Sequence, residues 1–128
     1  MESKLMYVEL KSGHSDDEPA YIGKAFFSKT GKSVYFNGLT FSKESRSGGN
    51  YFDIISGDYY WISGIKKRGT NRHWAGHGKI KIDKNVVAEY LEIKNLSALS
   101  KSRFEIVQLN NMPPIESSNE FLNRKLEW

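Results

Sequence analysis

Positive charges and aromatic rings gather in one stretch of the sequence, between Tyr59 and Lys84. The charges come from lysines and arginines, and Asp83 is the only acid in the stretch. Flat rings interleave with these charges, beginning at Trp61. Cations that contact phosphates, combined with rings that stack on bases, are how small β-rich modules bind single-stranded nucleic acid or RNA loops. The candidate ligand-binding residues are Lys66, Lys67, Arg68, Arg72, His73 and Trp74.

The same stretch also fits a purely structural interpretation. Its two tryptophans would then belong to the hydrophobic core, and its lysines would solvate a hairpin. Arg68 and Arg72 would form ion pairs with Asp53 and Asp58. A protein-interaction module, such as an inhibitor or an immunity protein, is a second functional class. The sequence leaves these alternatives open.

Catalysis and metal binding find less support in the sequence. His73 as a general base, Ser63 as a nucleophile and Arg72 as an anion clamp would suffice for acyl or phosphoryl chemistry. However, no nucleophile elbow or paired-carboxylate motif accompanies them. His73 and His77 have the spacing of metal ligands on a helix, but the glycines on both sides of His77 disfavour a helix there. We therefore expect a non-enzymatic binding module that uses no metal or cofactor.

Length and composition limit the class of protein. The chain has 128 residues, which is enough for one domain with its own core. It contains no cysteine, so disulfides and thiolate metal sites are excluded. The net charge of +4 is only a modest excess. The N-terminal residues mix charges with a short apolar run, so we expect a cytoplasmic protein with neither a secretory signal nor a membrane span.

Short runs of β-branched and aromatic residues, separated by turn residues, predict a mostly β domain. Gly31 and the Asn37-Gly38 pair mark two tight hairpins. The polar segment 42–50 predicts a mobile loop. The spacing favours an antiparallel meander or a small open barrel, with protected edges. The expected strands cover residues 5–11, 21–28, 33–37, 39–41, 51–55, 59–63 and 79–83.

One helix is expected to pack on this sheet after residue 83. Asp83 is placed to cap a helix that starts at Lys84. Its apolar stripe consists of Val86, Val87, Tyr90 and Leu91. Strand-forming residues in segment 104–109 predict a return to the sheet. We expect a single β-rich domain over residues 1–110 and a C-terminal tail over residues 111–128, in which a short docked helix can form.

The basic-aromatic stretch resembles a block in a family of short bacterial proteins. Residues 60–83 match the pattern YWISGxKKxGxxRHWAGxGKIxID, and the similarity extends from about Met6 to Leu109. Members are sometimes labelled 1-deoxy-D-xylulose-5-phosphate synthase. That large thiamine-diphosphate enzyme has a cofactor-binding pattern which this chain lacks. The resemblance therefore implies no established activity.

Overall fold

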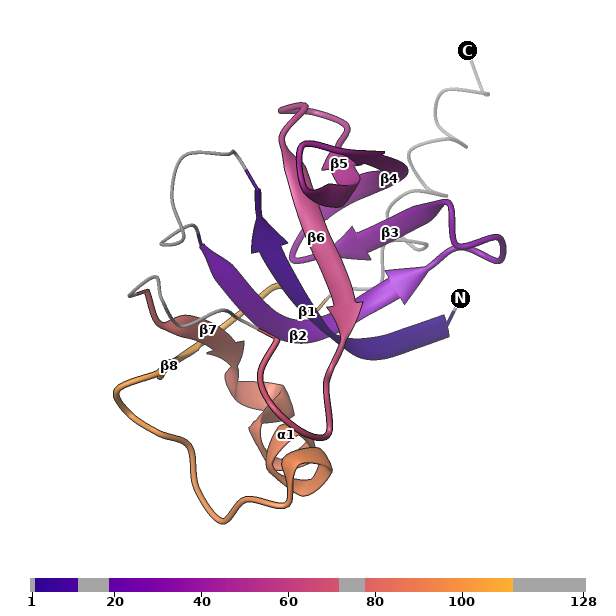
Figure 1. The fold of residues 1–128 in the computed structure, drawn as a ribbon. Coiled ribbons are helices and arrows are strands. Elements are labelled where there is room, and N and C mark those ends of the chain that lie inside the picture. Colours follow the sequence, from indigo (N-terminus) through magenta and orange to yellow (C-terminus); the bar gives the residue numbers. More distant parts are fainter. Residues whose placement is uncertain (1, 12–18, 72–77, 112–128) are drawn as a thin grey trace.

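A computed structural model describes residues 2–11, 19–71 and 78–111 of the chain (Figure 1). In this part of the chain, eight strands form one mixed sheet, and one helical segment follows the seventh strand. The mostly β fold predicted from the sequence is therefore confirmed. The strands are β1 (Glu2–Leu10), β2 (Ala20–Phe27), β3 (Ser33–Phe36), β4 (Leu39–Arg46), β5 (Gly49–Asp53), β6 (Tyr59–Gly64), β7 (Ile80–Asp83) and β8 (Phe104–Val107).

Six of these strands form a nearly closed ring. Strands β2 to β6 follow one another as antiparallel neighbours, and β1 pairs with both β2 and β6. This double pairing of β1 brings the two ends of the meander together. The long pairing edges of the ring strands are thereby occupied, as closure of a barrel requires.

Strand β2 joins the ring to a second part of the sheet. Its last residues pair with β3, whereas Ala20–Ile22 pair with β7 in parallel orientation. Strand β8 then pairs in parallel with β7. The expected antiparallel meander or small open barrel thus describes the ring, to which β7 and β8 add two strands in parallel orientation. A parallel pair needs a crossover connection, and the helical segment between β7 and β8 supplies it (Figure 1).

The helical segment consists of a 3-10 turn, η1 (Lys84–Val86), followed by α1 (Val87–Lys94). The Asp83 side chain accepts a hydrogen bond from the amide of Asn85, at 3.2 Å, so the predicted cap is confirmed. Val86 and Tyr90 are buried, as predicted. Leu91 is only half-buried, so its assignment to the core was wrong. The next apolar residue that packs on the core is Ile93, because it lies three positions after Tyr90 and shares its helix face.

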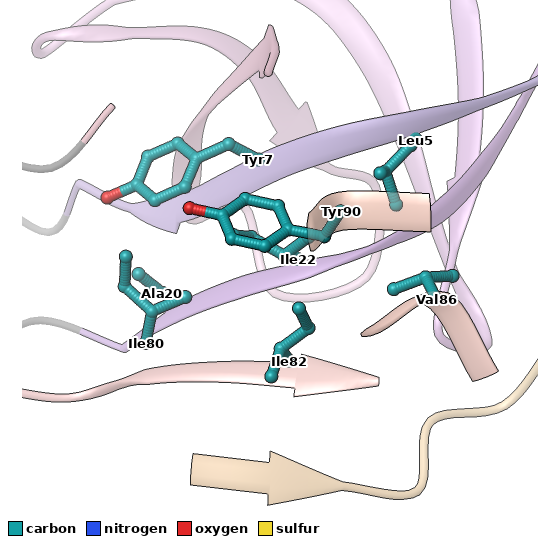
Figure 2. Packing of buried hydrophobic residues seen from close by; sticks show 8 residues of the cluster. All are labelled: Leu5, Tyr7, Ala20, Ile22, Ile80, Ile82, Val86 and Tyr90. Atoms are coloured by element: carbon teal, nitrogen blue, oxygen red, sulfur yellow. The ribbon is translucent and has the colours of Figure 1, made fainter. Parts of the chain in front are cut away.

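Two hydrophobic clusters lie on opposite faces of the sheet. The first is packed between the helical segment and strands β1, β2 and β7, and includes Tyr7, Ile22 and Ile82 (Figure 2). The second fills the ring and includes Val8, Phe41 and Ile62. Adjacent residues of β1 thus point into different clusters, and the strand is buried on both faces at Tyr7 and Val8.

The segment 42–50, predicted as a mobile loop, is an ordered hairpin. Strand β4 continues to Arg46, and Ser47 and Gly48 take φ angles of 55° and 84°. Positive φ at both central residues is the requirement of a tight two-residue hairpin turn. The Asn50 amide group then donates to the carbonyl of Ile62 and accepts from its N–H, both at 2.8 Å. This side chain extends the pairing of β5 with β6, which is why the polar segment is ordered.

The described residues contain no helix that is long and apolar enough to span a membrane. The predicted C-terminal tail begins at Asn111, which is described, whereas the rest of the tail and the helix expected in it lie outside the described residues.

Candidate nucleic-acid interface

Strand β6 places Trp61 on the outer face of the ring. Ile62 belongs to the second cluster inside the ring and Tyr60 packs against it, so Trp61 between them faces outward. Trp61 is 41% exposed, and Tyr59 and Ser63 flank it on the same face. Of the alternatives left open by the sequence, the one in which Trp61 belongs to the core is therefore wrong. Strand alternation, which puts Ile62 inside, accounts for its position.

The residue opposite Trp61 on β1 is an acid whose negative charge is balanced by an ion pair. Glu9 is paired with Trp61 in the strand register and is only 7% exposed. Its carboxylate accepts a hydrogen bond from the Tyr7 hydroxyl and forms an ion pair of 2.8 Å with Lys11. The tryptophan ring therefore lies beside a neutralised carboxylate rather than an open negative charge.

Strand β6 leads directly into the basic loop, and two side chains anchor the loop at its base. Ile65 packs against the first hydrophobic cluster. The Asn71 side chain donates to the hydroxyl of Ser63 at 3.1 Å and to the carbonyl of Gly64 at 2.9 Å. Its oxygen accepts from the amide of Lys66 at 3.2 Å. These contacts join the end of the loop, at Asn71, to its beginning.

The end of α1 holds the same loop from the other side. The Lys94 ammonium group donates hydrogen bonds to the main-chain carbonyls of Lys66 and Gly69. Gly69 has a φ angle of 72°, a conformation in which glycine avoids the strain of a side chain. The loop backbone is thus fixed to the helix while its own charged side chains extend outward.

Lys66, Lys67 and Arg68 are all exposed. Within the part of the chain that the structure describes, none of the three has a carboxylate partner within ion-pair distance. The structural interpretation, in which Arg68 would pair with Asp53 or Asp58, is therefore wrong for this residue. Both aspartates lie at the other end of β6, and Asp53 is buried and accepts from the amide of Ile55 at 2.9 Å.

The structure brings half of the predicted site residues together. Lys66, Lys67 and Arg68 follow one another on the anchored loop. Arg72, His73 and Trp74 lie outside the described residues, as does His77.

Sequence reasoning did not assign Asn71 and Lys94 a role at the site. The signal for Asn71 was weak, because one asparagine near a glycine is common in turns. Lys94 lies more than twenty residues further along the chain, so only the packing of α1 reveals its contact with the loop.

The described groups do not form a catalytic arrangement around Ser63. Its hydroxyl receives a hydrogen bond from the Asn71 amide, which is not a base.

At the other end of β6, the hydrogen bond between the Tyr59 hydroxyl and the Glu44 carboxylate raises the pKa of Tyr59, with smaller contributions from burial and from the Glu44 charge. A raised pKa keeps this phenol protonated, so it acts as a hydrogen-bond donor on the outer face.

Among residues 2–11, 19–71 and 78–111, no cluster of acidic or histidine side chains is placed to hold a metal ion. No protein-family model, curated protein or solved structure matches this chain. The assignment of a function therefore rests on the geometry of the loop and of β6.

Proposed function

We propose that this protein is a binding module for single-stranded nucleic acid. In this proposal, Lys66, Lys67 and Arg68 contact phosphates, and Trp61 stacks on a base. Arg72, His73 and Trp74, which lie outside the described residues, are expected from the sequence to contribute to the same binding. The reaction is binding alone, without a chemical step.

The observation that carries the proposal is the exposed Trp61 on the strand that leads into three cations without a carboxylate partner among the described residues. Rings on a sheet surface beside a basic groove are the usual elements of sequence-tolerant single-strand binding. The other large exposed apolar residues in the described segments belong to the turn after β5, to the segment after α1 and to β8. Among the large exposed apolar residues of the described segments, Trp61 is therefore the one aromatic ring, and a single exposed ring suits a base better than a broad apolar partner surface.

Charge reversal tests the phosphate contacts. We expect the Lys66→Glu, Lys67→Glu, Arg68→Glu variant to bind labelled single-stranded RNA or DNA more weakly than the wild type. Each lost phosphate contact should also reduce the slope of log affinity against log salt by about 0.7. Fluorescence anisotropy at several salt concentrations measures both quantities.

A matched control is available on the ring. Lys29, Lys32 and Lys43 are exposed, and Lys32 and Lys43 are joined through their backbones. Reversing these three charges changes the net charge equally but leaves the loop intact. Equal loss of affinity in both variants would indicate a general charge effect and would contradict the proposed site.

The stacking contact is tested separately. Replacing Trp61 by Ala should cost about 1–3 kcal/mol of binding free energy if the ring stacks on a base. The salt slope should stay almost unchanged, because no charge is removed. Circular dichroism must first show that the variant is folded. Ile55→Ala, at an 87% exposed position on the turn after β5, is the control.

A protein-interaction module is the second candidate. It is favoured by Ile54 and Ile55, which are 52% and 87% exposed on one turn. Exposed adjacent isoleucines are more typical of a protein contact than of a nucleic-acid contact. A pull-down from lysate with and without nuclease distinguishes the two candidates. Protein partners that persist after nuclease treatment, and that Ile55→Ala removes, would favour this second function.

A further inference from the structure

A pocket of about 230 Å³ lies between α1, the anchored loop and the segment that connects α1 to β8. Its floor includes Ile22, Ile80 and Phe104, which are apolar. Asn71, Lys94 and Arg103 also line it. No acidic residue is among its lining residues in the described segments. The pocket is separate from Trp61, which does not contribute to it.

One polar group in the pocket wall has no hydrogen-bond partner among the described residues. Tyr90 is only 7% exposed, and its ring packs against Phe104 with 5.5 Å between centroids. Within the described residues its hydroxyl makes no hydrogen bond. Figure 2 shows this hydroxyl pointing toward the Ile80 end of β7, away from Val86. Ile80 and Tyr90 both line the pocket, so the hydroxyl points toward the side of the core on which the pocket lies.

A buried hydroxyl without a partner costs free energy, and a bound molecule can supply the missing bond. Burial also raises the pKa of Tyr90 above the ordinary value of 10.0. The phenol therefore stays protonated in neutral solution and is a hydrogen-bond donor. An acceptor on a ligand would satisfy it.

A second donor lies one helical turn away. Tyr90 and Lys94 are four positions apart on α1, so their side chains share a helix face. The Lys94 ammonium group has three N–H donors, and two of them are used by the carbonyls of Lys66 and Gly69. One donor remains for a ligand. Arg103 adds positive charge at the same pocket.

We propose that this pocket binds a small carboxylic acid, whose carboxylate accepts hydrogen bonds from the Tyr90 hydroxyl and the Lys94 ammonium group. The apolar body of the acid packs against Ile22, Ile80 and Phe104. The pocket volume limits the size of the apolar part of the acid. A cavity of roughly 150 Å³ holds benzene, so about 230 Å³ suits one aromatic ring with a short side chain. This inference does not depend on the proposed binding of nucleic acid.

The probe is phenylacetate, with phenylacetamide as its neutral counterpart. Isothermal titration calorimetry on the full chain should show saturable, one-site binding of phenylacetate with Kd of roughly 0.01–1 mM. Phenylacetamide should bind at least about tenfold more weakly, because charge-assisted hydrogen bonds are stronger than neutral ones.

Two substitutions identify the donors. Tyr90→Phe removes only the hydroxyl and keeps the ring contact with Phe104, so the variant should fold and should bind phenylacetate roughly threefold to tenfold more weakly. Lys94→Met should remove most of the preference for the acid over the amide. The matched control is Lys84→Met, an exposed lysine of η1 that does not line the pocket. It should bind as the wild type does.

The Lys94→Met variant also loses its bonds to the loop, so the Tyr90→Phe result is needed beside it. Weaker binding in both variants, with Lys84→Met unchanged, supports the site. Absence of saturable binding by the wild type at about 10 mM phenylacetate would overturn it. Equal affinity of Tyr90→Phe and wild type, or equal affinity for acid and amide, would overturn it as well.

Discussion

The ammonium group of Lys94, in the last turn of α1, lies 2.7 Å from the main-chain carbonyl oxygen of Lys66. A second hydrogen bond joins the same group to the carbonyl of Gly69. A charge-assisted bond to a carbonyl is stronger than a neutral one, and here a single side chain makes two. The helix that covers the first hydrophobic cluster therefore also determines where the basic loop lies.

Replacing Lys94 by Met should loosen this loop without unfolding the protein. The amide of Lys66, which donates to Asn71, should then exchange its hydrogen roughly tenfold faster, because loss of the two bonds is worth about 1.4 kcal/mol to the closed loop. Hydrogen exchange followed by NMR measures this effect. Lys84→Met is the control, and equal exchange rates in the two variants would contradict the role of Lys94.

Two glycines near β6 should respond differently to substitution by alanine. A Cβ at Gly49 would lie 2.7 Å from the main-chain oxygen of Tyr60, closer than atoms can approach. Gly49→Ala should therefore destabilise the protein by about 1–3 kcal/mol in urea unfolding. Nothing lies within 4 Å of a Cβ at Gly64, so Gly64→Ala should change the stability by less than about 0.5 kcal/mol. Similar losses at both positions would show that the close approach of β5 and β6 is not what requires Gly49.

Truncation of the first cluster tests the packing of the helical segment on the sheet. Ile82 is fully buried in this cluster, so Ile82→Ala should cost about 2–5 kcal/mol of unfolding free energy. Leu91 is half-buried and outside the cluster, so Leu91→Ala should cost about 1 kcal/mol or less. Thermal or urea unfolding measures both. A larger loss for Leu91 than for Ile82 would mean that another face of α1 is packed.

Three buried or half-buried tyrosines predict a loss of stability in alkaline solution. Burial raises the pKa values of Tyr51, Tyr60 and Tyr90 above the ordinary value of 10.0. For Tyr60, the negative charges of Asp53 and Asp58 add to the effect of burial. A raised pKa means that the fold prefers the neutral phenol. This contribution to stability is complete below the unfolded-state pKa of about 10 and is lost as the pH rises through the folded-state pKa.

Urea unfolding at a series of pH values checks this prediction. The unfolding free energy should begin to fall above about pH 10, as phenolate absorbance appears on unfolding. The Tyr90→Phe variant should show a shallower fall, because it has one shifted tyrosine fewer. A wild-type protein whose stability stays constant well beyond this range would contradict the assignment of these tyrosines to the interior.

The sequence by itself determined most of the local structure of this protein. Alternating apolar residues, tight-turn glycines and the Asp83 cap each act within a few neighbouring positions, so the ring strands and the start of the helix could be predicted from them. The polar segment 42–50 was misjudged because its order depends on the contact of Asn50 with Ile62, on another strand. The positive charge of the basic loop could also be predicted from the sequence, since Lys66, Lys67 and Arg68 are consecutive in the chain.

Only the tertiary structure decided how these parts meet. The parallel pairing of β7 with β2 joins segments far apart in the sequence, and no local pattern specifies a partner strand. The exposure of Trp61 depends on which face of β6 meets the ring interior, a choice that strand alternation leaves open. The pocket beside Tyr90 and the contact of Lys94 with the loop arise from the packing of α1 against two distant segments. Such contacts are set by the collective burial of apolar surface in three dimensions, which residue spacing along one chain does not record.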